Sequence, residues 1–216
     1  MRTPMKEADW YWNTRMKSLK KALERNGMKA VIARTGEEAR KKALRMIPKG
    51  AEVGLGGSRT VQEIGLLDDL RKGDYRLHDQ YAPGLTIESS RGIRVAGTNA
   101  GYFVSGTNAI TDDGKLVNID GAGNRLAGFC YGPEKVILVI GRNKIVADVD
   151  AAIDRVRNVA APMNARRFGL KTPCATTGKC SDCSSPQRIC NLTLIIEKQN
   201  PKGRITVILV NEDLGF

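Results

Sequence analysis

Apolar residues near the start of the chain recur with helical spacing, interrupted by one short continuous apolar run. The first set predicts an amphipathic helix that ends at Asn26-Gly27, and it consists of Trp12, Met16, Leu19 and Leu23. Residues 29–33 are typical of a short buried strand. Residues 36–47 carry acidic residues early and basic residues late, which favours a second helix through its dipole, and Pro48 ends it.

The next part of the chain repeats strand and helix around a glycine-rich turn. Residues 51–55 predict a strand, Gly56 and Gly57 a tight turn, and Ser58 the start of a helix that ends near residues 72–73. The apolar face of that helix is expected at Val61, Ile64, Leu67 and Leu70. Residues 75–79 follow as a strand. This alternation predicts a mainly parallel sheet covered by helices on both faces, in which ligands bind at the carboxyl ends of the strands.

The rest of the chain adds elements of the same kind. Strands are expected at residues 102–105, 135–141, 192–197 and 204–209, and helices at residues 86–100 and 149–160. The run 135–141 is typical of a central strand buried on both faces. The last helix should continue to residue 167 with a kink or restart at Pro162, and Asp113-Gly114 predicts a turn between two β-like runs.

We therefore predict a single α/β domain over residues 1–216, with an N-terminal helix within residues 1–27, a Cys-rich insertion at 172–190 and C-terminal strands. Two Trp residues, Trp10 and Trp12, lie in the first helix and should pack on the domain or on a partner subunit, which suggests a homodimer.

The chain is strongly basic, with a formal charge of +12 from 35 Lys and Arg against 23 Asp and Glu. Because the basic residues are scattered and only four Phe are present, the composition favours small anionic metabolites or cofactors over nucleic acid. No apolar run approaches the roughly 20 residues that span a bilayer. The first ten residues lack the apolar core of a signal peptide, so we expect a cytoplasmic protein with no membrane partner.

The glycine-rich turn is the first candidate binding site. Gly56 and Gly57 would let the backbone approach an anion, and Ser58 could cap the following helix or bond a ligand oxygen. A turn of this composition also joins strand and helix in many α/β proteins that bind nothing there.

A second candidate is a block of small and polar residues between residues 106 and 125. Its candidate ligand-binding residues are Asn108, Asp120, Gly121, Asn124 and Arg125. Glycines allow close backbone approach, while Asp, Asn and Arg supply hydrogen-bonding groups. The alternative is a hairpin whose polar residues only form turns and caps, and we assign Asp113 to that role.

Four cysteines lie within seventeen residues, at Cys174, Cys180, Cys183 and Cys190. The Cys180-x-x-Cys183 pair has the spacing that lets two thiolates share one ion, and the outer cysteines could complete a tetrahedron. Zinc or an iron–sulfur cluster would suit such a site, and the alternatives are free thiols or a redox-sensitive disulfide. Cys130 lies in an apolar setting and is predicted to be a core residue.

Catalytic groups are harder to assign. The chain has one histidine, His78, which we interpret as a structural residue at a strand end, because no nucleophile elbow accompanies it. A Walker phosphate loop and a Gly-x-Gly-x-x-Gly turn are also absent. Glu63 and Asp120, and less directly Asp79, are the candidates for a catalytic acid or base.

Several of these segments together resemble the LUD-domain family of lactate utilisation proteins. They are residues 53–58, 63–67, 106–125 and 161–167, the cysteine segment and residues 210–216. The resemblance implies a fold like that of ribose-5-phosphate isomerase, glucosamine-6-phosphate deaminase and the CoA transferases, in which a Gly-rich turn holds a phosphate or carboxylate. It also implies a role in the oxidation of L-lactate to pyruvate, alongside iron–sulfur oxidoreductase subunits.

Three functions stay open at this point. The protein is an accessory or catalytic component of lactate oxidation, a metal-stabilised binding or regulatory protein without turnover, or an enzyme similar to the sugar-phosphate isomerases or CoA transferases.

Overall fold

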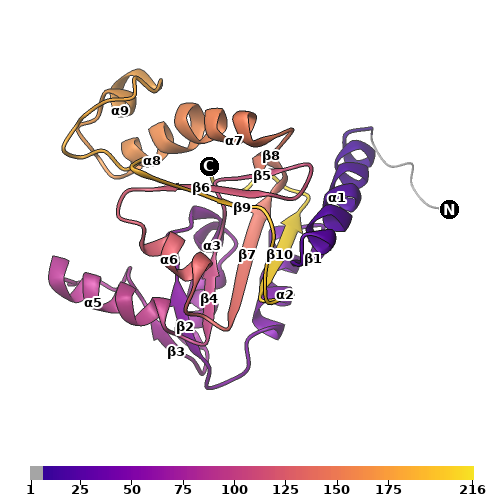
Figure 1. The fold of residues 1–216 in the computed structure, drawn as a ribbon. Coiled ribbons are helices and arrows are strands. Elements are labelled where there is room, and N and C mark those ends of the chain that lie inside the picture. Colours follow the sequence, from indigo (N-terminus) through magenta and orange to yellow (C-terminus); the bar gives the residue numbers. More distant parts are fainter. Residues whose placement is uncertain (1–6) are drawn as a thin grey trace.

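A computed structural model describes residues 7–216 (Figure 1). Helix α1 (Glu7–Arg25) confirms the predicted N-terminal helix, and its buried side chains include Met16, Leu19 and Leu23. Residues 1–6 lie outside the described residues. They are the start of the predicted segment 1–27 and belong to the ten residues in which a signal-peptide core was sought. Trp10 is 60% exposed, whereas Trp12 packs against the core.

The main sheet has six parallel strands in the order β1-β10-β7-β4-β2-β3, as the alternation of strand and helix predicts. The strands are β1 (Lys29–Ala33), β2 (Glu52–Leu55), β3 (Arg76–His78), β4 (Tyr102–Ser105), β7 (Lys135–Gly141) and β10 (Ile205–Val210). Strand β7 lies near the middle. Its side chains alternate between two cores, with Leu138 in one and Val139 in the other, so it is buried on both faces.

Helices cover both faces of this sheet. In one core, α1 and α6 (Asn124–Cys130) pack against one face of the sheet. In the other core, α2 (Gly36–Arg45) and two short helices pack against the opposite face. Helix α5 (Ile87–Thr98) contacts the edge strand β3 and its neighbour β2. Gly54 in β2 makes that contact close, because a Cβ there would stand 1.9 Å from the carbonyl oxygen of Gly97 in α5.

A second, four-stranded sheet of order β8-β5-β6-β9 lies beyond one end of the main sheet (Figure 1). It contains β5 (Ala109–Thr111), β6 (Leu116–Asp120), β8 (Ile145–Val146) and β9 (Leu192–Ile196). Gly114, at φ +86°, forms the predicted turn between β5 and β6. The two C-terminal strands divide between the sheets, since β9 pairs with β6 and β10 enters the main sheet.

One long helical segment packs on the second sheet. It consists of α7 (Val149–Arg155), the π-helical turn η2 (Val156–Ala160) and α8 (Ala161–Arg167). The α-helical pattern resumes at Ala161, directly before Pro162, where a kink or restart was predicted. Ala152, Val156 and Ala160 face Val117 and Ile119 of β6. The short α9 (Pro173–Thr177) then opens the cysteine segment.

Two predictions about local structure are wrong. The helix expected from Ser58 to residue 72 is divided into α3 (Arg59–Glu63) and α4 (Leu66–Lys72), because Gly65 adopts a left-handed conformation at φ +72°. Cys130 is exposed rather than buried, since it is the last residue of α6 and the helix turns its neighbour Phe129 toward Phe103 instead.

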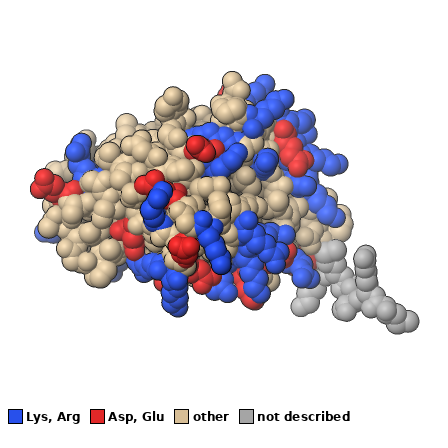
Figure 2. Space-filling model, turned by 90° about the horizontal axis from the view of Figure 1, so that it is seen from below, with Lys and Arg blue, Asp and Glu red and all other residues tan. Residues whose placement is uncertain are grey.

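No helix among the described residues is long and apolar enough to cross a membrane. On the face in Figure 2, Lys and Arg side chains are spread over the surface and mixed with Asp and Glu. That distribution agrees with the scattered charges of the sequence.

Candidate functional site

A cavity of about 550 Å³ opens where the main-sheet strands end. Some of its lining residues follow the main-sheet strands β2, β3, β4 and β7 in the chain. The rest of the wall comes from α5, from the end of β6 and the start of α6, from η2 and α8, from residues 188–191 and from Phe216. The cavity is therefore at the carboxyl ends of parallel strands, where ligands of open α/β sheets bind. Its volume is in the range of pockets for drug-sized ligands.

The glycine-rich turn contributes to this cavity through Gly57 and Ser58. A Cβ at Gly57 would meet only the Tyr81 hydroxyl, at 3.7 Å, so this residue has open space beside it. Gly56 has a different role, because a Cβ there would clash with Ser105 at 2.4 Å. We conclude that Gly56 is required for packing and that Gly57 provides the close approach to the cavity.

Ser58 is partly committed to the protein itself. Its Oγ accepts a hydrogen bond from the Val61 backbone at 3.3 Å, which caps α3, and its backbone N–H donates to the Tyr81 hydroxyl at 3.2 Å. The Ser58 hydroxyl proton is left available to the cavity. Burial is the main reason why the pKa of Tyr81 is raised, so its phenol is a neutral group at this site.

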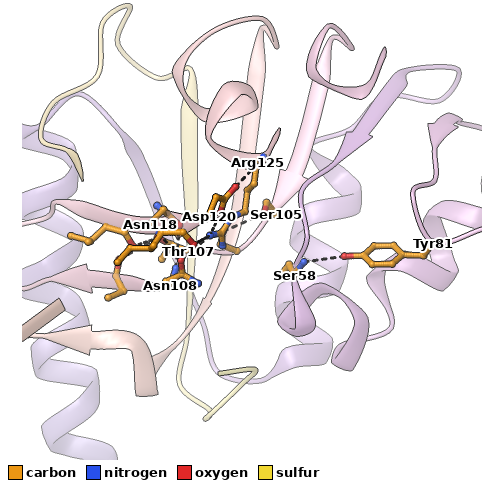
Figure 3. A network of polar contacts seen from close by, with 12 residues as sticks. Ser58, Tyr81, Ser105, Thr107, Asn108, Asn118, Asp120 and Arg125 are labelled. Atoms are coloured by element: carbon orange, nitrogen blue, oxygen red, sulfur yellow. Dashed lines mark hydrogen bonds and ion pairs between the residues drawn. The ribbon is translucent and has the colours of Figure 1, made fainter. Parts of the chain in front are cut away.

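The second predicted block forms a buried hydrogen-bond network, which is separate from the Ser58–Tyr81 pair (Figure 3). Arg125 forms an ion pair with Asp120, whose Oδ1 accepts from Nε at 2.9 Å and whose Oδ2 accepts from the Arg125 backbone at 3.2 Å. Arg125 also donates to Asn108 Oδ1 at 2.7 Å. The Asn118 amide accepts from the Asn108 backbone and from the Thr107 hydroxyl. The network holds the cavity wall in one arrangement.

The remaining predicted residues fall into two groups. Gly121 and Asn124 line the cavity, as do Asn108, Asp120 and Arg125. Glu63 does not line it, because its carboxylate accepts from the Gly215 backbone at 2.6 Å and from Arg59 at 3.1 Å. Asp79 is paired with Arg71 outside the cavity. His78 ends β3, where its Nε2 lies 2.7 Å from Glu52 Oε1.

Lys144 is a cavity residue that the sequence reasoning missed. It ends the 3-10 helix η1 (Arg142–Lys144) after β7, it is only 4% exposed, and its Nζ donates to the Thr60 hydroxyl at 2.9 Å. Burial, followed by the charges of Arg155 and Arg125, lowers the pKa of Lys144 to about 7. One signal was in the sequence: Lys144 lies three residues beyond the predicted central strand, at the edge where ligands bind.

The wall is strongly cationic. Its basic residues are Arg59, Arg94, Arg125, Lys144, Arg167 and Arg188, whereas Asp120 has the single acidic side chain among the described lining residues. Arg94 bonds to Ser90, and Arg167 bonds to Asn164 and lies over the Phe168 ring. In the part of the chain that the structure describes, Arg94 and Arg167 have no carboxylate ion-pair partner, so their charge is available to a ligand in the cavity.

The cysteine segment borders the same cavity. Its Arg188 lies in the wall, donates to the carbonyls of Cys183 and Cys190, and pairs with Asp182 at 2.8 Å. The thiol of Cys190 is close enough to the other three thiols for their charges to act on it, and burial is the main reason why its pKa is raised. Within residues 7–216, however, no group of three or more His, Cys, Asp or Glu side chains is arranged to hold a metal ion. The predicted metal or cluster at these cysteines thus has no geometric support and stays a prediction.

Comparisons with known proteins agree with this architecture. A family model described as the LUD domain matches residues 16–210. A solved structure described as a DUF162 family protein from Deinococcus radiodurans is similar with a TM-score of 0.51 and 12% sequence identity, over 92% of this chain and 97% of that one. At such low identity the similarity shows the fold alone. No curated protein matches the chain.

Proposed function

The chain belongs to the LUD-domain family, and we propose that it binds a small anionic metabolite, a carboxylate such as lactate or pyruvate, as a component of lactate oxidation. The observation that carries this proposal is the cationic cavity wall. Asp120 has the one acidic side chain among its described lining residues, and it is already paired with Arg125. A guanidinium with no carboxylate partner can bind the two oxygens of a ligand carboxylate at once.

The size of the cavity extends the proposal. A volume of about 550 Å³ is much larger than a three-carbon acid, so the site has room for an anionic cofactor beside it. A ligand of the kind used by sugar-phosphate isomerases or CoA transferases is the alternative that this volume favours. Partner subunits with iron–sulfur clusters, a homodimer and a location in the cytoplasm remain parts of the proposal that rest on the sequence.

The test is calorimetric titration of the purified protein with L-lactate, with pyruvate and with inorganic phosphate. Arg94→Gln and Arg167→Gln should each weaken carboxylate binding about tenfold, the effect of losing one charge-assisted hydrogen bond. Arg91→Gln and Arg166→Gln are matched controls, because both residues are exposed neighbours that do not line the cavity. Binding of phosphate but of neither acid would replace the carboxylate by a phosphorylated ligand, and no binding of any of the three would refute the proposal.

The cysteine prediction needs its own experiment. Elemental analysis and an absorption spectrum of protein purified without oxygen distinguish iron, zinc and free thiols. Iron with a brown colour would favour electron transfer, and zinc a structural role. Absence of both metals would leave Cys174, Cys180, Cys183 and Cys190 as free thiols or a disulfide pair.

A further inference from the structure

The surroundings of Lys144 are unusual for a lysine. Its Nζ donates to the Thr60 hydroxyl, which itself donates to the carbonyl of Leu214 at 3.2 Å. The remaining positions on the nitrogen have no hydrogen-bond partner or ion pair among the described residues. Glu63 is near enough to favour the ammonium form, but its carboxylate is held by Arg59 and Gly215, and its effect is smaller than those of burial, Arg155 and Arg125.

These surroundings give the Lys144 nitrogen the character of a nucleophile. An amine that is buried and subject to the charges of two guanidinium groups loses its proton more easily than an exposed one, and the neutral amine has a free lone pair. Lysines desolvated in this way, or placed beside another cation, form Schiff bases with carbonyl compounds. Lys144 lines the cavity, so its side chain borders the space that a bound carbonyl compound would occupy.

The cavity wall limits which carbonyl compounds would bind. Arg94 and Arg167 line the same cavity without carboxylate partners among the described residues, so they favour a ligand that carries a carboxylate next to its carbonyl group. A 2-oxo acid has this arrangement, whereas a simple aldehyde or ketone lacks the anion. L-lactate has the carboxylate but a hydroxyl in place of the carbonyl.

We propose that Lys144 forms an imine with the keto carbon of a small 2-oxo acid, of which pyruvate is the simplest stable example. This inference rests on the proposed binding of a small carboxylate in the cavity. The lone pair of Nζ adds to the keto carbon while the carbonyl oxygen takes up a proton. That proton comes from the amine, so the addition gives a carbinolamine. Loss of its hydroxyl with the second amine proton, as one water molecule, leaves a carbon–nitrogen double bond, and the step needs no oxidant or reductant.

Reductive trapping tests the proposal directly. The protein is incubated with pyruvate near pH 7 and treated with sodium borohydride, which reduces the imine to a stable secondary amine. The intact mass should increase by one reduced pyruvyl group, and peptide mapping should place the group on Lys144. L-lactate under the same treatment should give no adduct, because it has no carbonyl carbon to attack.

Variants make the result specific. Lys144→Arg keeps the positive charge but cannot form the imine. Lys144→Met removes both the charge and the amine, so the adduct should be lost in both variants. Circular dichroism confirms that each variant is folded, and mapping of the wild-type adduct remains decisive if one is not. An adduct on other lysines, or retained in the variants, would overturn the assignment. Titration with pyruvate without borohydride separates the two proposals: binding with no adduct refutes the imine and leaves the proposed function. If pyruvate does not bind, the imine is refuted, and the titrations with L-lactate and phosphate decide the proposed function.

Discussion

Replacement of Lys144 by Met should change how the stability of the protein depends on pH. In the folded protein the pKa of Lys144 is about 7, against the ordinary lysine value of 10.5 that applies to the unfolded chain. Between these two values the unfolded chain binds more protons than the folded protein. Stability therefore rises with pH across this window, and below pH 7 the full cost of burying the charge is present.

The size of the effect follows from the two pKa values. Titration of this one group should raise the free energy of unfolding by about 2 kcal/mol between pH 7 and about pH 9. In Lys144→Met that contribution should disappear. The variant should also be at least as stable as the wild type at pH 7, since Met has a similar length and the Thr60 hydroxyl keeps its bond to Leu214.

The assay is urea unfolding of both proteins at the two pH values, followed by circular dichroism. The quantity of interest is the difference between the two pH-dependent changes, because contributions from every other titrating group cancel. Pyruvate or another anion in the cavity should raise the pKa of the ammonium form and reduce the difference. Equal pH dependence in wild type and Lys144→Met would show that the amine titrates normally and would remove the physical basis for a nucleophilic lysine.

Two further changes test the fold and the network. Gly54→Ala should lower the free energy of unfolding by about 3 kcal/mol, because its Cβ would clash with the Gly97 carbonyl. The control is Gly92→Ala in α5, whose Cβ meets no atom within 4 Å and which should raise the free energy of unfolding by up to about 1 kcal/mol. Equal effects of the two substitutions in denaturant titrations would contradict this packing. Asp120→Asn should cost about 3–5 kcal/mol, since it leaves the buried Arg125 guanidinium without its counter-charge; a loss below about 1 kcal/mol, as for an exposed pair, would contradict the buried network.

The main sheet could be predicted because its strands carry strong local patterns. The apolar run of β7 is continuous because both faces of this strand are buried. Helix α1 has its buried apolar residues at helical spacing, on one face. The second sheet could not be predicted in the same way. Strands β5 and β8 have three and two residues, too few for a periodic pattern, and they exist because β5 can pair with β6 on one side and with β8 on the other.

The candidate site was predictable in position but not in the roles of its residues. The alternation of strand and helix indicates the carboxyl edge of the sheet, and both predicted blocks meet there. The different roles of Gly56 and Gly57 depend on Ser105, because this residue of another strand packs directly against Gly56. Likewise the carboxylate of Glu63 is directed away from the cavity by the Gly215 backbone, which is remote in the sequence.

Lys144 shows most clearly why local sequence is insufficient at this site. In the sequence it follows Arg142 and Asn143 and resembles any polar residue after a strand. Its burial arises from contacts made by distant segments, since Thr60 accepts its hydrogen bond and is itself fixed by the carbonyl of Leu214. The same distant contacts that exclude water from the amine also lower its pKa, so its reactivity is a property of the assembled fold.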